Sequence, residues 1–260
     1  MKYQLPTLAT LILLSTVVPA SSQEVEFDPL GRDLPLESLE KLMQIQVEWI
    51  EVDAEIATEL LMDEDPTQPA TIRSSNAGPL RQTLQASINK GKATLIESTM
   101  VTARSGQRAK VESIYEYIYP SEYDAGSFLH SEKALGTATK QIAPQATAFE
   151  TRNVGVTLEV DPVLGADDRA IELNLAPELV YLTGKESWGT HKAEGSEVEV
   201  LMPSFYTVKT TTQVCIIAGE YLLMSVQSPR DLKTGMTDPS RKVLVFVKAN
   251  LIAVGMPLKK

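Results

Sequence analysis

The most regular pattern in the chain is a pair of segments in which apolar residues occupy every second position. These segments cover residues 154–160 and 171–175. A period of two is typical of a strand with one buried face. The residues between them, Gly165-Ala166-Asp167-Asp168, are turn formers, so the pattern predicts an antiparallel hairpin.

The same reasoning predicts strands through most of the chain. The first is 45–52, whose apolar positions change phase after Trp49, which indicates a bulge. The turn at 218–220 is expected to fold the strand before it back onto the strand after it. Further predicted strands cover 93–102, 109–119, 197–201, 208–217, 221–226 and 242–252.

Two long segments lack a clear alternation of apolar and polar residues. Residues 120–148 are interpreted as a loop or weak hairpin, and residues 183–196 as a polar loop around Trp188. Helical spacing is confined to the front of the chain, at 36–43, 53–62 and 79–91. The predicted fold is therefore mainly β and antiparallel, with two or three short helices near the N-terminus.

The N-terminal segment has the features of a secretory signal peptide over residues 1–22. Lys2 supplies the positive end, an apolar stretch runs from Leu8 to Val18, and small residues flank Ala20. A short membrane anchor or a buried helix is the alternative. We predict a flexible lead and short helix over 23–44, one β-domain over 45–252 and a tail over 253–260. The protein is expected to be exported.

Composition excludes several classes of function. The chain has 260 residues and a formal net charge of −10, with 24 Lys and Arg against 34 Asp and Glu, so no basic surface for nucleic acid is expected. One cysteine cannot form an internal disulfide. Two histidines and one cysteine are too few for most zinc sites.

Residues that could carry chemistry are isolated from one another. His130 and His191 are predicted in loops without a nearby nucleophile, and Cys215 is predicted to be a buried, inert thiol within a strand. Glu48 and Glu51 could form a glycosidase pair, although strand carboxylates that face solvent are the simpler interpretation. We therefore predict no enzyme, no catalytic residue, no cofactor and no metal.

Several segments, in chain order, resemble the C-terminal domain of bacterial secretins. These proteins are the ring-forming outer-membrane channels of type II and type III secretion and of type IV pilus systems. The most specific matches are VGVTLEVDP at 154–162 and IELNLAPE at 171–178. The other matches are IQVEWIEV at 45–52, a helix at 80–92, a strand at 93–104, SGQRAKV at 105–111, PSF at 203–205, TQVCIIAGE at 212–220 and the last strand at 242–252.

The resemblance assigns structural roles to particular residues. Gly155 would allow close backbone packing between Val154 and Val156. Pro162 and Pro177 would end strands, since proline cannot donate to a strand ladder. Gly219 would allow a tight hairpin turn. The family-motif residues are Gly106, Val154, Gly155, Val156, Pro162, Pro177, Glu178 and Gly219.

The resemblance implies a structural role in the outer membrane or periplasm of a Gram-negative type of bacterium. The expected partners are further copies of the chain in a ring, other secretion or pilus components, and the outer membrane. Two departures from the family are expected: the N-terminal ring domains would be lacking, and Leu222-Leu223-Met224-Ser225 stands where a Gly-Gly-Leu motif is usual. The alternatives are a periplasmic accessory or binding module that forms no pore, and an envelope hydrolase.

Overall fold

The structure is a computed structural model that describes residues 39–61, 74–124, 127–130, 139–142, 144–193, 196–232 and 234–255. The predicted signal peptide and most of the predicted lead lie outside these residues. The elements are β1 (Lys41–Asp53), α1 (Ala54–Leu61), α2 (Gly78–Asn89), β2 (Ala93–Arg104), β3 (Ala109–Asp124), β4 (Ser127–His130), β5 (Thr139–Ile142), β6 (Gln145–Leu164), β7 (Ala170–Ala193), β8 (Ser196–Lys209), β9 (Thr212–Ile217), β10 (Tyr221–Gln227) and β11 (Arg241–Ala253). The mainly antiparallel β fold predicted from the sequence is confirmed.

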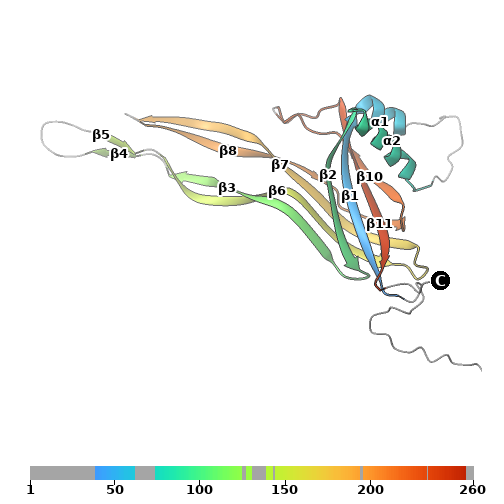
Figure 1. Cartoon of the computed structure of the whole chain (residues 1–260). Helices are drawn as coiled ribbons and strands as arrows, with labels where there is room; N and C mark the ends of the chain where they lie inside the picture. The colour runs from blue at the N-terminus through green and yellow to red at the C-terminus, as the bar shows by residue number, and fades with distance from the viewer. Residues whose placement is uncertain are drawn as a thin grey trace, which may run out of the picture.

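The strands form two principal sheets, which we call sheet A and sheet B. Sheet A has the order β10-β11-β1-β2, and sheet B has the order β3-β6-β7-β8 with β9 also paired to β7. All of these pairings are antiparallel. The short strands β4 and β5 form a separate hairpin between β3 and β6 (Figure 1).

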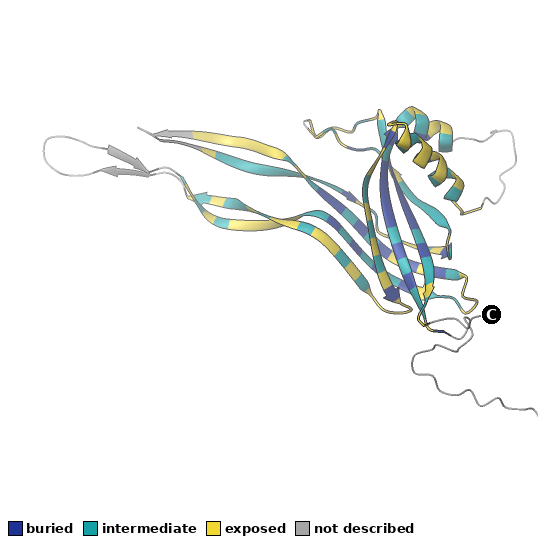
Figure 2. Ribbon diagram, viewed as in Figure 1, coloured by how far each residue is buried: buried dark blue, intermediate teal, exposed yellow. Residues whose placement is uncertain are grey.

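The body of the molecule has three layers: the helices, sheet A and sheet B (Figure 1). Residues such as Val47, Trp49 and Leu158 form the core between the two sheets. A second core, including Ile50 and Leu84, lies between sheet A and the helices. Figure 2 shows that buried residues concentrate in this body.

The central position of β1 explains the phase change of its apolar residues. Ile45, Val47 and Trp49 contribute to the core between the sheets, whereas Ile50 and Val52 contribute to the core under the helices. The predicted irregularity exists, because the β1–β2 register shifts between Trp49 and Ile50. The extra residue belongs to β2, however, and the β1–β11 pairing is regular throughout.

The two helices begin close to where the sequence predicted them. Ala54, after Asp53, begins α1, and Pro79 lies in the first turn of α2, where its missing N–H needs no partner. The prediction of helix over 36–43 was wrong for its described part, because residues 41–43 belong to β1. Met43 is fully buried in the core between the sheets, so tertiary packing overrides the local helical spacing.

Three predictions about turns and loops were also wrong. Within the segment predicted as a loop at 183–196, residues 183–193 belong to β7 and pair with β8. The strand predicted over 208–217 is interrupted after Lys209. The turn at 218–220 does not fold β10 back onto β9, because β10 pairs with β11 in the other sheet. The segment 120–148 includes the β4–β5 hairpin, which agrees with one of its two interpretations.

Candidate functional site: the divided sheet and its two arms

Sheet B divides into two separate hairpins beyond the body. The pairing of β6 with β7 covers only Gly155–Leu164 and Ile171–Val180. Beyond that point β6 pairs only with β3 and β7 pairs only with β8. We call the β3–β6 hairpin over 114–124 and 145–154 arm 1, and the β7–β8 hairpin over 181–206 arm 2. Both project away from the body (Figure 1).

The division begins at Gly155, a position that only glycine can occupy without strain. Its φ is +128°, a conformation that L side chains rarely adopt. A Cβ atom on Gly155 would lie 2.2 Å from the carbonyl oxygen of Ser113 on β3. The backbones of β6 and β3 therefore approach closely at the point where β6 leaves β7. Its neighbour Val156 is 4% exposed in the core between the sheets, and Val154 belongs to arm 1.

Aromatic side chains hold the two arms against each other near their base. The ring of Phe205 on β8 lies 6.0 Å from the ring of Tyr117 and 5.7 Å from that of Tyr119, measured between centroids. The Lys185 ammonium of arm 2 lies 5.8 Å from the centroid of Tyr117 on arm 1. Such aromatic and cation–π contacts each contribute about 1 kcal/mol.

Two tyrosines mark the base of arm 2 on the side that faces sheet A. Tyr181 and Tyr206 are opposite each other in the β7–β8 register, and their rings lie nearly parallel with centroids 6.1 Å apart. Burial raises the pKa of Tyr181 to about 12, helped by the nearby carboxylate of Glu51. Both phenols are therefore neutral across the physiological pH range.

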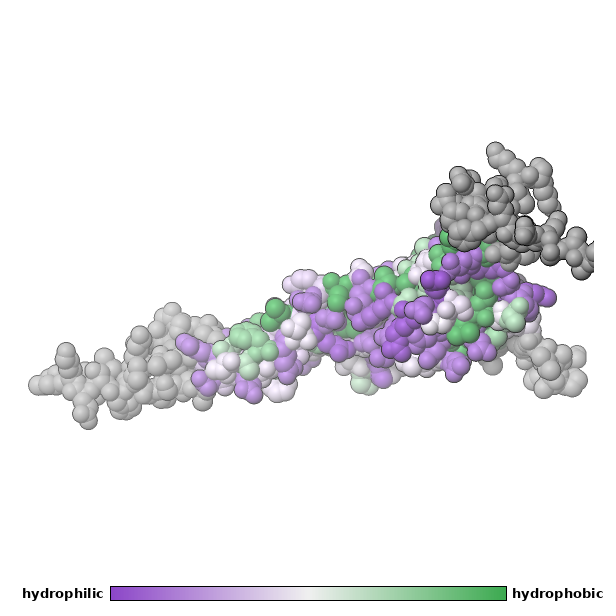
Figure 3. Space-filling view, turned by 90° about the horizontal axis from the view of Figure 1, so that it is seen from below, coloured by the Kyte–Doolittle hydropathy of each residue, from purple (hydrophilic) through white to green (hydrophobic). Residues whose placement is uncertain are grey.

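The arms expose large apolar side chains along their length. Tyr115 is 68% exposed and Ile118 is 64% exposed on β3, Phe149 is 61% exposed on β6, and Trp188 is 74% exposed on β7. Figure 3 shows hydrophobic residues beside the grey atoms at the left end of the molecule, while hydrophilic residues predominate in the middle. Within the described residues, the chain leaves these four side chains mostly uncovered.

The arms also leave backbone edges free. Among the described residues, β3 is paired only along its β6 side, and β8 only along its β7 side. In the arms, β6 and β7 no longer pair with each other, which leaves the edges at 145–154 and 181–193 without a partner strand among the described residues. An unpaired strand edge is a template for another strand, which soluble monomers usually block.

Near the body, the outer face of sheet B is polar and ion-paired. Glu178 on β7 accepts from Lys209 at 3.0 Å and lies 3.5 Å from the guanidinium of Arg152. On the same face, the Arg108 guanidinium forms ion pairs with the carboxylates of Glu159 at 3.0 Å and Asp161 at 3.1 Å. The family-motif residue Glu178 thus links β6, β7 and β8 just where the sheet divides.

Neither of the two motif prolines ends a strand, contrary to the sequence prediction. Pro162 lies inside β6 and Pro177 inside β7. The carbonyl of Pro162 accepts from the Gly106 N–H at 2.8 Å, and that of Pro177 accepts from the Thr210 N–H at 3.1 Å. The N and O atoms of a strand residue point to the same side of the strand. The nitrogen of Pro162 therefore faces the turn at Gly106, and that of Pro177 faces the break at Thr210, where no strand needs an N–H donor.

The motif glycines Gly106 and Gly219 lie where the chain changes sheets. Gly106 follows β2 of sheet A and binds the end of β6 through Pro162. Gly219 has a φ of +86° and donates to the Ala249 carbonyl at 2.7 Å, while Ala218 donates to the Arg169 carbonyl at 2.8 Å. The predicted hairpin at Gly219 is therefore a crossover from sheet B to sheet A.

The structure places the two histidines, the cysteine and Glu48, which could carry chemistry, on different strands. His130 lies in β4 and His191 in β7, so the prediction of loops was wrong for both. Cys215 is exposed rather than buried, because it points to the outer side of β9. Glu48 is 4% exposed and pairs with Arg81 of α2, so it faces the helix layer instead of solvent.

Among the described residues there is neither a metal-ligating cluster nor a membrane-spanning helix. No group of three or more His, Cys, Asp or Glu side chains in that part of the chain could hold a metal ion. No helix in the same residues is long and apolar enough to cross a membrane.

Comparisons with known proteins give structural matches but no sequence matches. No protein-family model matches the chain. No curated protein matches it in sequence. One structural match is the Salmonella SPI-1 type III secretion injectisome secretin InvG, which is 14% identical. The match covers 84% of this chain and 63% of the InvG chain, with a TM-score of 0.35.

Two further matches come from other secretion and pilus systems. The V. cholerae type IV competence pilus secretin PilQ is 13% identical, with 82% of this chain and 57% of that chain covered and a TM-score of 0.28. The type II secretin GspD from enteropathogenic Escherichia coli is 11% identical, with 82% and 67% covered and a TM-score of 0.31. The chain thus spans less than two thirds of the length of the first two. The solved structures to which this chain is similar include secretins, the family that its motifs resemble.

Proposed function

We propose that this protein is a structural, non-enzymatic component of a bacterial envelope that assembles with copies of itself through its two arms. The assembly would be a ring or channel in the outer membrane that serves protein secretion or pilus transport. The single observation that carries the proposal is the pair of arms, which combine exposed apolar side chains with unpaired strand edges. A neighbouring copy that adds its strands to these edges covers both at once.

The sequence motifs support the same proposal independently of the arms. The segments at 154–162 and 171–178 resemble secretin motifs, and they form the β6–β7 pairing from which both arms extend. A heterologous contact between different edges closes into a ring when the rotation between subunits allows it. Other secretion or pilus components and the outer membrane remain the partners that we propose.

A second candidate is a periplasmic accessory module that retains this fold without forming a pore. The ion-paired outer face of sheet B around Glu178 favours it, because that face is suited to water. The two candidates differ in oligomeric state, which makes them separable by one measurement.

The test is to extract the full chain with detergent and examine it by native gel electrophoresis and negative-stain imaging. Large, heat-resistant rings are expected. A clean monomer would contradict the ring and support the accessory module; its mass would be 28.5 kDa for the full chain, or lower if the predicted signal peptide is removed.

A variant separates assembly from folding. Ile118→Thr combined with Phe149→Thr removes exposed apolar groups from arm 1, so the free energy of unfolding should change by no more than about 0.5 kcal/mol per site. The fraction of assembled protein should fall. Glu116→Gln, on an exposed position of the same strand, is the matched control and should assemble normally.

A further inference from the structure

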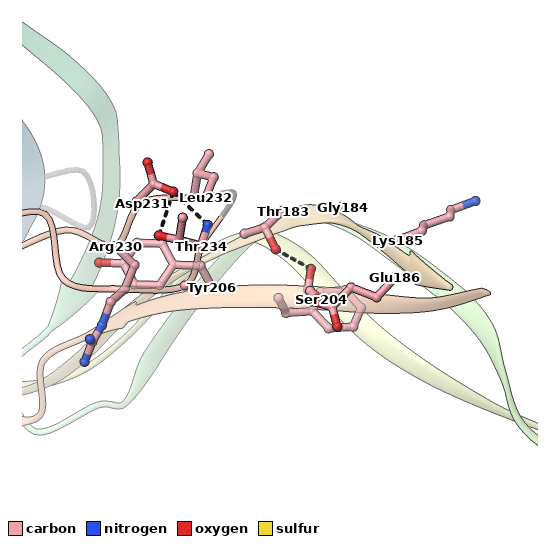
Figure 4. Close-up of a pocket in the computed structure, with 12 residues that line it drawn as sticks. Thr183, Gly184, Lys185, Glu186, Ser204, Tyr206, Arg230, Asp231, Leu232 and Thr234 are labelled. Atoms are coloured by element: carbon pink, nitrogen blue, oxygen red, sulfur yellow. Dashed lines mark hydrogen bonds between the residues drawn. The ribbon is translucent and has the colours of Figure 1, made fainter. Parts of the chain in front are cut away.

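A cavity of about 200 Å³ lies between sheet A and sheet B at the base of arm 2. The loop that connects β10 to β11, residues 228–240, contributes a third wall. The larger groove of Figure 4 adjoins the cavity and shares three lining residues with it. The cavity is lined by Glu51, Ile96, Arg241 and Val243 of sheet A, by Tyr181, Tyr206 and Val208 of sheet B, and by Pro229, Arg230 and Leu232 of the loop.

The cavity forms where sheet A ends and sheet B continues. Sheet A ends just beyond Glu51 and Arg241, because β1 stops at Asp53 and β11 starts at Arg241. The strands β7 and β8 continue as arm 2. Val208 and Val243 are almost fully buried in the core between the sheets. The cavity is therefore the last part of this core, which no side chain of the described residues fills.

The size and lining of the cavity suit one aromatic ring. The lining is mainly apolar, with Ile96, Val208 and Val243 near the rings of Tyr181 and Tyr206. An apolar cavity of about 150 Å³ in a protein core can bind benzene. The volume here is therefore enough for a single six-membered ring with a small substituent.

One polar group of the cavity has no hydrogen-bond partner in the described part of the chain. The backbone N–H of Arg230 bonds to the Tyr206 hydroxyl, and Arg241 donates to the Glu51 carboxylate. The Tyr181 hydroxyl makes no hydrogen bond with the described residues, and burial is the main cause of its raised pKa. A hydroxyl in such a poorly hydrated place gains from a ligand that accepts its hydrogen bond.

A hydrogen-bond acceptor lies close to this donor. The Glu51 carboxylate is near enough to Tyr181 to raise the pKa of its phenol further. A carboxylate has about four acceptor positions, and Arg241 uses one of them at Oε1. A single hydroxyl group on a ligand can therefore accept from Tyr181 and donate to Glu51 at the same time.

We infer that the cavity between the sheets binds a small neutral phenol, which is one aromatic ring with one hydroxyl group. The ring lies among Ile96, Val208 and Val243, and the hydroxyl bridges Tyr181 and Glu51. Because the ligand contacts sheet A and arm 2 together, it fixes the base of the arm against the body. This inference does not depend on assembly into a ring.

The test is isothermal titration calorimetry of the purified full chain with p-cresol, and with toluene as the matched ligand that lacks a hydroxyl. Saturable binding of p-cresol is expected, with a dissociation constant on the order of 1 mM. Toluene should bind about fivefold more weakly, because it forms no hydrogen bond with Tyr181.

Two variants separate the hydrogen bond from the cavity itself. Tyr181→Phe should weaken p-cresol binding about fivefold and leave toluene binding unchanged. Ile96→Phe fills the cavity and should abolish saturable binding of both ligands. Tyr115→Phe removes a hydroxyl from an exposed tyrosine outside the cavity, so this control should bind p-cresol as wild type does.

Three results would overturn the inference. The first is the absence of saturable p-cresol binding up to about 10 mM, which is about ten times the expected dissociation constant. The second is p-cresol binding that Ile96→Phe leaves unchanged while its far-ultraviolet circular dichroism matches wild type, since the ligand then lies elsewhere. The third is an equal loss of p-cresol and toluene affinity in Tyr181→Phe, since Tyr181 then makes no hydrogen bond to the ligand hydroxyl.

Discussion

The two halves of β6 belong to one continuous strand but differ in what covers them. In the body half, Val156, Leu158 and Val160 are at most 4% exposed, since sheet A lies over them. In the arm half, Phe149 is 61% exposed and β6 has no partner on its β7 side. The backbone conformation is the same, so the difference comes from the layers around the strand (Figure 2).

This difference shows which part of the fold one chain can stabilise by itself. The body buries apolar side chains on both sides of sheet A, at about 25 cal/mol for each Å² of apolar surface removed from water. Arm 1 and arm 2 rely on backbone pairing and a few aromatic contacts. An isolated two-stranded hairpin is marginally stable in water, so the arms gain most from further strands.

The largest expected effect comes from breaking the junction between the two halves of β6. Gly155→Ala places a Cβ against the Ser113 carbonyl and forces a side chain into a positive φ. Strain and crowding together should lower the free energy of unfolding by about 4 kcal/mol. Urea unfolding, followed through buried Trp49 in a Trp188→Phe background, measures the loss.

Gly184→Ala is the matched control for this prediction, because a Cβ there meets nothing within 4 Å. It lies in arm 2 and should cost less than about 1 kcal/mol. Equal losses for the two variants would show that Gly155 has no special role at the junction.

The second largest loss of stability is expected in the body. Arg81→Met leaves the Glu48 carboxylate, which is 4% exposed, without its cation under α2. Removing one partner of a buried pair should cost about 3 kcal/mol. Chemical denaturation against wild type gives the value.

Arg108→Met is the comparison for Arg81→Met, since it removes an ion pair with Asp161 on the exposed outer face. Solvent screens such a pair, so the loss should stay below about 1 kcal/mol. A similar cost for both variants would mean that the helix layer does not bury Glu48 as the structure shows.

The smallest effect concerns the loop that connects β10 to β11, which we call the strap. Hydrogen bonds from the Ser240 hydroxyl and then from Arg241 lower the pKa of Asp238 to about 2. A lowered carboxyl pKa means that these bonds stabilise the folded strap above the unfolded pKa of about 4, and that this is lost as pH falls toward 2. The Ser240 amide shift, followed by NMR against pH, should have its midpoint near 2 and be flat above pH 4. A midpoint near 4 would contradict these bonds.

The sequence predicts the body well because its strands obey the period-two pattern. The hairpin of 154–160 with 171–175 was correct, since one side of each strand is buried and the other is polar. Both helices were found because Asp53 and Pro79 mark their starts. The motif glycine Gly155 was identified, although only the structure shows the carbonyl that excludes a side chain there.

The β7 half of arm 2 could not be predicted, because residues 183–190 have no buried side to produce alternation. The exposed residues of 183–190 include Gly184, Gly189 and Trp188, a composition that looks like a loop until a partner strand is seen. Turn residues also cannot show which sheet the next strand joins, so the crossover at Gly219 was mistaken for a hairpin.

The two crossovers at Gly106 and Gly219 have a consequence for the order in which the protein is built. Sheet B comes entirely from the middle of the chain, whereas sheet A joins β1 and β2 from its beginning to β10 and β11 from its end. Lys41 pairs with Ala253, so the most distant parts of the described chain must meet to complete the body. Contacts of such long sequence separation form slowly. During synthesis or export, both arms can therefore fold as local hairpins before β11 arrives, and the last strand to emerge is the one that closes the core.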